Sequence, residues 1–188
     1  MQVVSLNVGE VQVVPWEGRE IRTGFRKRPV RGPVPLRGVN LAGDDQADRT
    51  VHGGRQKTVY VYPSEHYPYW QEALEVRSLG WGAFGENLTT SGWLESAAHI
   101  GDVVRIGTAT LVITQPRFPC YKLNAVFARS DMVQRFQRSG RSGFYLAPVS
   151  EGEMGEGNSI ELLSQTAGAP AVSEVFAREV ARESNPNP

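Results

Sequence analysis

Cys120 is the residue of this chain with the clearest capacity for chemistry. It is the one cysteine among 188 residues, and it follows the segment 115–119 (QPRFP). One thiol alone forms neither an internal disulfide nor a thiolate zinc site. Its chemistry would therefore be that of a nucleophile, or of a single ligand to a cofactor that carries its own metal. The nearby cations Arg117 and Lys122 favour the thiolate, the form that attacks and binds metals, whereas a buried small hydrophobe is the alternative role.

The segment 23–34 carries four basic residues between glycines and prolines, among them Lys27 and Arg28. A loop of this composition presents ammonium and guanidinium groups to a phosphate or another anion. A solvated surface loop is the alternative interpretation, because runs of charge are most often exposed.

Two glycine-containing segments offer further polar groups. In the segment 44–57, the His-Gly-Gly turn at 52–54 can expose backbone N–H groups to an anion beside the imidazole, or can simply supply positive φ angles. The Asp and His spacings in that segment match no common zinc or calcium site. In the segment 82–92, Asn87 offers donors and an acceptor, and Glu86 is either a base or an ion-pair partner of an arginine.

The overall charge excludes some classes of partner. The chain has 20 basic and 20 acidic residues, so its formal net charge is zero, whereas general binders of nucleic acid or anionic membrane need a positive field. The N-terminus lacks the features of a signal peptide, and no apolar stretch is long enough to span a bilayer. One unpaired cysteine fits a reducing compartment. We therefore expect a cytoplasmic protein that binds neither nucleic acid nor membrane.

Short apolar runs between frequent glycines and prolines predict many strands and few helices. Strands are expected in the segments 2–8, 9–25, 34–39, 58–62, 101–111 and 160–163. Helices are expected in the segments 64–76, 125–139 and 171–183, and Ser130 is a candidate cap for a new helix within the second of them. The predicted class is mainly β with peripheral helices (α+β). The simplest division is one β-barrel domain at 1–165, followed by a short helical appendage with a disordered tail at 166–188.

Six short stretches stand in one order along the chain: 25–30 (FRKRPV), 43–48 (GDDQAD), 52–54 (HGG), 82–89 (GAFGENLT), 100–102 (IGD) and 115–120 (QPRFPC). Together they resemble the MOSC domain, named after the C-terminal domain of molybdenum cofactor sulfurase. Within that family the chain is most similar to a YiiM-like bacterial branch. The resemblance covers the chain from about Val3 to Leu163, and it is specific because all six stretches occur in the family's order.

The resemblance implies a β-barrel fold with a pocket for the molybdenum cofactor, a pterin dithiolene that carries a phosphate. It implies that Cys120 is both the catalytic residue and the protein ligand to molybdenum. The cofactor-binding residues that it implies are Thr23, Lys27, Arg28, His52, Gly53, Gly54, Asn87 and Arg117. A phosphate or sulfate is expected to bind near Lys27, Arg28 and the Gly53-Gly54 turn.

The reaction implied for this branch is the reduction of N-hydroxylated small molecules, such as hydroxylaminopurine-type bases, to amines. The chain contains no flavin or nicotinamide motif, so the electrons would come from a separate reductase. The protein would act as a monomer or a homodimer.

Three other interpretations remain open from the sequence. A carrier of the cofactor or of persulfide sulfur, without turnover of its own, shares every feature of the reductase. A cysteine hydrolase would use Cys120 with His52 and an acid such as Asp48. A plain interaction module would bury Cys120 and point Lys27, Arg28 and Arg117 apart into solvent, whereas a cofactor protein would gather these groups around one cavity.

Overall fold

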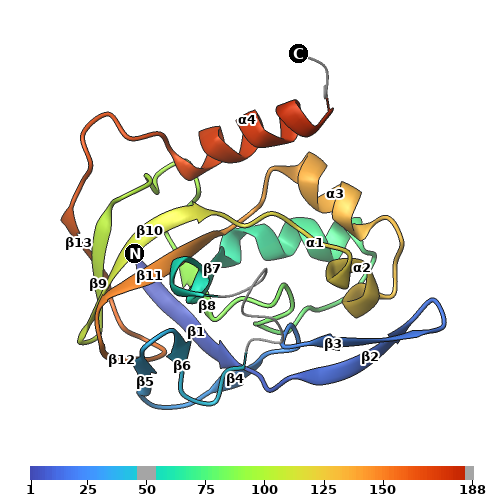
Figure 1. Ribbon diagram of the computed structural model, residues 1–188, viewed down its shortest axis with the longest axis horizontal. Helices are drawn as coiled ribbons and strands as arrows, with labels where there is room; N and C mark the ends of the chain where they lie inside the picture. Colours follow the sequence, from blue (N-terminus) through green and yellow to red (C-terminus); the bar gives the residue numbers. More distant parts are fainter. Residues whose placement is uncertain (46–53, 185–188) are drawn as a thin grey trace.

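An eight-stranded sheet forms the centre of the computed structural model, which describes residues 1–45 and 54–184. Its strand order is β13-β9-β10-β11-β7-β8-β1-β4 (Figure 1). The strands are β1 (Gln2–Val8), β4 (Arg28–Val30), β7 (Val59–Pro63), β8 (Leu88–Ser91), β9 (Val103–Ile106), β10 (Ala109–Pro116), β11 (Phe144–Ser150) and β13 (Ile160–Ser164). Neighbouring strands are antiparallel except β7 and β8, which are parallel and therefore need a long crossover.

The sheet curls until its first and last parts meet at one end. The N–H of Val3 donates to the carbonyl of Asn158 at 2.9 Å, and the N–H of Ile160 donates to the carbonyl of Met1 at 2.9 Å. The second half of β1 cannot continue this contact, because its free edge pairs with β4 between Leu6 and Val8. The expected mainly β class with peripheral helices is thus confirmed, but the expected barrel is a curled sheet without a closed ladder in the described residues.

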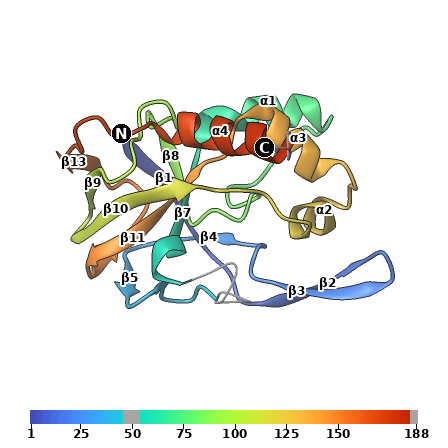
Figure 2. The same ribbon diagram turned by 45° about the horizontal axis from the view of Figure 1, so that its top comes forward.

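Two small sheets flank the main one. β12 (Gly152–Met154), β5 (Val34–Arg37) and β6 (Asn40–Leu41) form the first. The hairpin of β2 (Gln12–Trp16) and β3 (Arg19–Thr23) forms the second and extends below helix α2 (Figure 2). Side chains of Val14, Ile21 and Ala125 join the hairpin to α2 in a small apolar cluster. This contact places the end of β3, and with it Thr23, near the segment that carries Cys120.

Four α-helices and two short 3₁₀-helices complete the described chain. They are η1 (Arg55–Lys57), η2 (Ser64–His66), α1 (Tyr67–Ala73), α2 (Lys122–Phe127), α3 (Met132–Ser139) and α4 (Val172–Ser184). Helices α1, α3 and α4 lie along one side of the sheet (Figure 2). No helix in these residues is long and apolar enough to cross a membrane.

Helix boundaries inside the expected segments depend on local backbone geometry. The helical segment expected at 125–139 is divided near the candidate cap Ser130, because Ala128 adopts a left-handed conformation with φ of 52° and ends α2. The carboxylate of Asp131 accepts hydrogen bonds from Arg129 and Arg135, and α3 begins directly after it. The segment expected at 64–76 begins as a 3₁₀ turn before it continues as α1.

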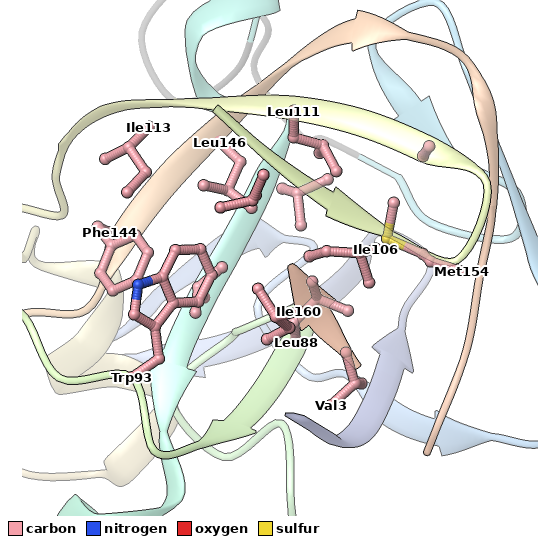
Figure 3. Close-up of a cluster of buried hydrophobic side chains, with 14 of the residues drawn as sticks. Val3, Leu88, Trp93, Ile106, Leu111, Ile113, Phe144, Leu146, Met154 and Ile160 are labelled. Carbon is pink, nitrogen blue, oxygen red and sulfur yellow. The ribbon is translucent and has the colours of Figure 1, made fainter. Parts of the chain in front are cut away.

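Alternating side chains of the central strands build the main apolar core (Figure 3). In β10, for example, Ala109, Leu111 and Ile113 are buried while the residues between them are more exposed. The ring of Trp93 packs edge-on against Phe144 with 4.8 Å between centroids. This core fills the interior of the sheet with apolar side chains.

A second, aromatic cluster packs between the sheet and helices α1 and α3. Tyr62, Trp70, Phe84 and Phe136 are its most deeply buried large members. The indole N–H of Trp70 donates to the hydroxyl of Tyr62 at 2.6 Å, which satisfies the buried polar atoms. This cluster lies beside the cavity described next, because Phe84 belongs to both.

Candidate functional site

A cavity of about 110 Å³ opens between the end of the β2–β3 hairpin, the start of β7 and the segment that follows β10. It is lined by Thr23, Gly24, Phe25, Lys27, Asp44, Asp45, Lys57, Thr58, Tyr60, Phe84, Gly85, Asn87, Arg117, Phe118, Cys120, Lys122 and Tyr145. The structure therefore brings together five of the residues that the sequence indicates, which are Thr23, Lys27, Asn87, Arg117 and Cys120.

Two further expected site residues, Arg28 and Gly54, are not among the described residues that line this cavity. Arg28 is exposed on the edge strand β4, and Gly54 precedes η1 with a φ of 87°. His52 and Gly53 lie outside the described residues, as does Asp48, the acid of the hydrolase interpretation.

Cys120 is half-buried at the point where the chain leaves the sheet and turns into α2. Pro116 ends β10 and Pro119 follows shortly after it, and neither residue has an N–H with which to continue a ladder. The carbonyl of Cys120 accepts a hydrogen bond from the N–H of Leu123 at 2.9 Å. The backbone of Cys120 is thereby tied to the following helix, at the cavity that Cys120 lines.

Arg117 is a buried cation with an open donor. The residue is only 4% exposed, and its guanidinium lies over three aromatic rings at 5.2, 5.3 and 4.9 Å from the centroids of Phe25, Tyr60 and Phe136. Its Nη1 is buried without a hydrogen-bond partner among the described residues. An unsatisfied buried donor on a charged group costs stability. The Nη1 donor of Arg117 can thus bind an acceptor atom of a ligand in the cavity.

Lys27 and Asp44 form a buried ion pair in the cavity wall. Burial lowers the pKa of the Lys27 ammonium, although the attraction of Asp44 opposes this change. The same carboxylate accepts the N–H of Gly9 at 2.9 Å and the side-chain amide of Asn87 at 2.9 Å. Lys27 is consequently held by the wall itself and is not a free cation at the mouth.

Asn87 uses its whole amide to join elements of the fold. Its Oδ1 accepts the N–H of Tyr60 at 3.0 Å, and its Nδ2 donates to the carbonyl of Asn7 as well as to Asp44. Thr23 is similarly engaged, since its Oγ1 accepts the N–H of Phe25 at 3.1 Å. These two residues shape the cavity, and their contacts are with the protein.

Glu86 stands behind the cavity and organises the loop 82–89. Its carboxylate accepts hydrogen bonds from the Tyr67 hydroxyl at 2.5 Å, the N–H groups of Gly82 and Phe84 at 2.8 and 3.1 Å, and the Thr89 hydroxyl at 2.8 Å. Burial raises the pKa of Glu86, while these donors favour its ionised form. The carboxylate is thus a structural acceptor, not a base in the cavity or the partner of an arginine.

Sequence reasoning missed several lining residues. Lys57 and Lys122 add positive charge, and Tyr60 and Tyr145 present aromatic rings with 5.3 Å between their centroids. Burial raises the pKa of Tyr145, although the nearby Arg117 cation opposes the change. Every residue of β7 is buried, so the sequence of this strand does not show that the Tyr60 ring borders a cavity. Lys122 is expected as a cation near Cys120, and the structure shows that it also lines the cavity.

Comparison with known proteins identifies the family of this chain. A model of the MOSC domain matches residues 48–161. The uncharacterized protein YflK of Bacillus subtilis (strain 168) is 44% identical over 178 residues, which cover 95% of this chain and 79% of YflK. The crystal structure of YiiM from Geobacillus stearothermophilus superposes with a TM-score of 0.79 at 32% identity, covering 98% of this chain and 86% of that one. A protein named "Reductase" from Gibberella moniliformis (strain M3125 / FGSC 7600) is 33% identical over 151 residues, 79% of this chain and 27% of that protein.

These matches define the class of protein first: a MOSC-domain protein with a single cysteine at its cavity. The chain belongs to the MOSC domain family, and YiiM is among its structural neighbours. The family is associated with the molybdenum cofactor.

Proposed function

We propose that this protein binds the molybdenum cofactor through Cys120 and reduces N-hydroxylated compounds, such as hydroxylaminopurine-type bases, with electrons from a separate reductase. One observation carries the proposal: the thiol of Cys120 and the open guanidinium donor of Arg117 line the same cavity. The fungal relative named "Reductase" supports the reaction class.

The donor set at the cavity fits such a cofactor. A molybdenum centre bound by dithiolene sulfurs accepts one further soft ligand, and a single thiolate is sufficient for that position. The phosphate and the polar edge of the pterin need cations and N–H donors, which Arg117 and Lys122 can provide. The Lys27–Asp44 pair would serve as a fixed wall, since Lys27 already has its counter-ion.

The chain's own residues would prepare the reaction rather than perform its redox step. When bound, the cofactor would supply the redox chemistry for removal of the substrate oxygen. Overall the N–O bond breaks, the oxygen leaves as water, and two electrons and two protons are consumed. Cys120 would hold the metal, and Arg117 would orient the ligand beside it. Tyr145, whose pKa burial raises, keeps a proton on its hydroxyl at neutral pH.

An exposed aromatic side chain in the cavity lining favours a flat substrate. Phe118 lines the cavity together with Cys120 and is 36% exposed. Aromatic rings of this kind stack on planar heterocycles. A base analogue with an exocyclic N-hydroxyl group would meet both requirements of the site, a flat ring and a reducible N–O bond.

We also propose where the protein acts and which partners it has. The neutral net charge favours a small-molecule substrate over nucleic acid or membrane. We propose a cytoplasmic protein, monomeric or homodimeric, that receives electrons from its reductase partner.

The deciding experiment is expression in a cofactor-producing host, followed by measurement of bound molybdenum and pterin. Hydroxylaminopurine reduction is then assayed with chemically reduced methyl viologen as the electron source. Cys120→Ala should lose both metal and turnover, whereas the control Ser130→Ala, an exposed change near α2, should keep both. A metal-free wild type under cofactor-sufficient conditions, or full activity of Cys120→Ala, contradicts the proposal. Bound cofactor without turnover supports the carrier function instead.

A further inference from the structure

Helix α4 reaches the cysteine site although it lies outside the matched MOSC region 48–161. It packs against β10, the strand that leads into the segment 117–121, which we call the Cys120 loop (Figure 1). The contact is made by aromatic rings. Phe176 of α4 is only 2% exposed and stacks on Phe118 with 5.3 Å between centroids and an interplanar angle of 18°. Phe118 is two residues before Cys120, so the helix touches the middle of the loop.

The helix is itself fixed where it begins. The N–H of Val172 donates to the carbonyl of Ala98 at 2.8 Å, and the N–H of Ser173 donates to the carbonyl of Glu95 at 3.2 Å. The Val172 side chain is fully buried in the main core. At the other end, the Gln137 side chain of α3 donates to Glu183 at 3.2 Å. Phe176 is therefore presented to the loop by a helix that is tied to the sheet.

The same anchor also reaches the start of the Cys120 loop. The carboxylate of Glu95 accepts the N–H of Gly143 at 2.7 Å, and the carbonyl of Gly143 accepts the N–H of Arg117 at 3.2 Å. The far end of the loop is held by the hydrogen bond from Leu123 to Cys120. Backbone contacts thus secure both ends, and the Phe118–Phe176 stack secures the middle.

We infer that α4 is part of the functional site, with Phe176 as a positioning residue that holds the Cys120 thiol at the cavity. This role rests on the proposed function of Cys120 as a cofactor ligand. A ligand thiolate must be held in place by its surroundings to complete a metal's coordination, and residues behind the ligand supply that order. Phe176 acts through Phe118 and is not among the described residues that line the cavity.

Because Cys120 is the one cysteine of the chain, its rate of reaction with a thiol reagent reports directly on the Cys120 loop. The test therefore needs no cofactor. The rate at which a disulfide reagent such as DTNB labels Cys120 is measured on cofactor-free protein. Phe176→Ala should label faster than wild type by roughly fivefold or more, because the loop opens locally once the stack is lost. Phe176→Tyr keeps the stacked ring and should restore a rate near that of wild type.

Two further variants separate positioning from general stability. Leu36→Ala removes a fully buried side chain from β5 in the main core, away from the Cys120 loop, and should label at the wild-type rate while folded. Phe176→Leu keeps an apolar side chain without the ring and should give an intermediate rate; it also replaces Phe176→Ala if that variant fails to fold. Wild-type rates in both Phe176→Ala and Phe176→Leu, or equal acceleration in Leu36→Ala, would overturn the inference.

The molybdenum content of the same variants from a cofactor-producing host gives the second readout. Phe176→Ala should retain less metal than wild type, and Phe176→Tyr should recover it. If the wild type contains no molybdenum while Phe176→Ala still labels faster, the proposed function fails and the positioning of the loop stands. If the wild type contains molybdenum and labelling does not change, the positioning role fails alone.

Discussion

The cavity wall and the β9–β13 edge each carry an ion pair, but in opposite surroundings. In the wall, the side chains of Lys27 and Asp44 are 7% and 4% exposed. At the edge, those of Arg105 and Glu161 are 50% and 54% exposed and approach to 2.5 Å. Water and salt weaken the attraction at the edge, whereas both charges in the wall have lost most of their hydration.

The difference in exposure indicates that the two ion pairs have different roles. An exposed pair contributes little to stability and is easily replaced. A buried pair often stabilises a fold no better than apolar side chains of the same volume, but removal of one partner is severe. The pair in the wall is therefore better explained by the site, where Asp44 fixes Lys27, Asn87 and Gly9 around the cavity.

The largest effect is expected for Asp44→Ala. Loss of this carboxylate leaves Lys27 buried without its counter-ion, which should lower the free energy of unfolding by about 3–5 kcal/mol. The exposed neighbour Asp45 provides the control, because Asp45→Ala should change it by no more than about 0.5 kcal/mol. Urea unfolding followed by circular dichroism measures both. Equal effects of the two substitutions would show that the buried pair has no special weight.

Arg117→Met tests whether the buried cation serves a ligand instead of the fold. Methionine keeps apolar contact with the three rings, so the free energy of unfolding should stay within about 1 kcal/mol of wild type. Molybdenum content should nevertheless fall by about 10–100-fold, as for other residues that support a metal ligand. Elemental analysis of protein from a cofactor-producing host decides this. Arg105→Met at the exposed edge should alter neither quantity, and a full metal content in Arg117→Met contradicts the role of Arg117.

Glu86 is a further buried ionisable group, and its hydrogen-bond donors are neutral. The stability that it contributes should therefore depend on pH. Burial raises its folded-state pKa above the ordinary value of 4.5, so the folded protein holds this proton more tightly than the unfolded chain. Its contribution to stability is fully present below pH 4.5 and is lost as the pH rises through the folded-state pKa. The unfolding free energy of wild type relative to that of Glu86→Gln should therefore fall as the pH rises.

Urea titrations at a series of pH values measure that difference. The exposed substitution Glu161→Gln serves as the control and should show no comparable trend. A wild-type curve that runs parallel to that of Glu86→Gln across the acid range would contradict the direction of the pKa change.

The smallest effect is expected at the edge itself. Glu161→Ala should lower the free energy of unfolding by less than about 1 kcal/mol, and added salt should reduce even that. Urea unfolding with and without sodium chloride measures it. A loss comparable with that of Asp44→Ala would remove the contrast between the two regions.

Much of the fold was predictable because burial alternates along the strands. The apolar run Leu111-Val112-Ile113 between two threonines is enough to predict a strand, and the structure shows that Leu111 and Ile113 are its buried members. The division of the segment 125–139 was indicated only by the candidate cap Ser130, since the end of α2 depends on the left-handed backbone at Ala128. The predicted barrel is not closed because of a contact in the tertiary structure: β4 occupies the edge of β1 with which the last strand would have to pair.

The site was predictable in its residue types but not in its connections. Local composition indicated Cys120, Arg117 and Lys27, and all three line the cavity. Their partners come from distant segments, so the sequence could not show that Asp44 neutralises Lys27 or that three rings enclose Arg117. Arg28 has the same chemistry as Lys27 and is its neighbour in sequence, yet it remains exposed on β4.

The contact between the first strand and the start of the last one has a consequence for synthesis. Met1 and Val3 are hydrogen-bonded to Ile160 and Asn158, so strands formed early must wait for partners translated much later. The outer edge at the start of β1 stays without these bonds until residue 160 has left the ribosome. Exposed strand edges favour pairing with other chains, and such non-local pairing forms slowly. Nascent chains of this protein should therefore depend on chaperones until that final contact is made.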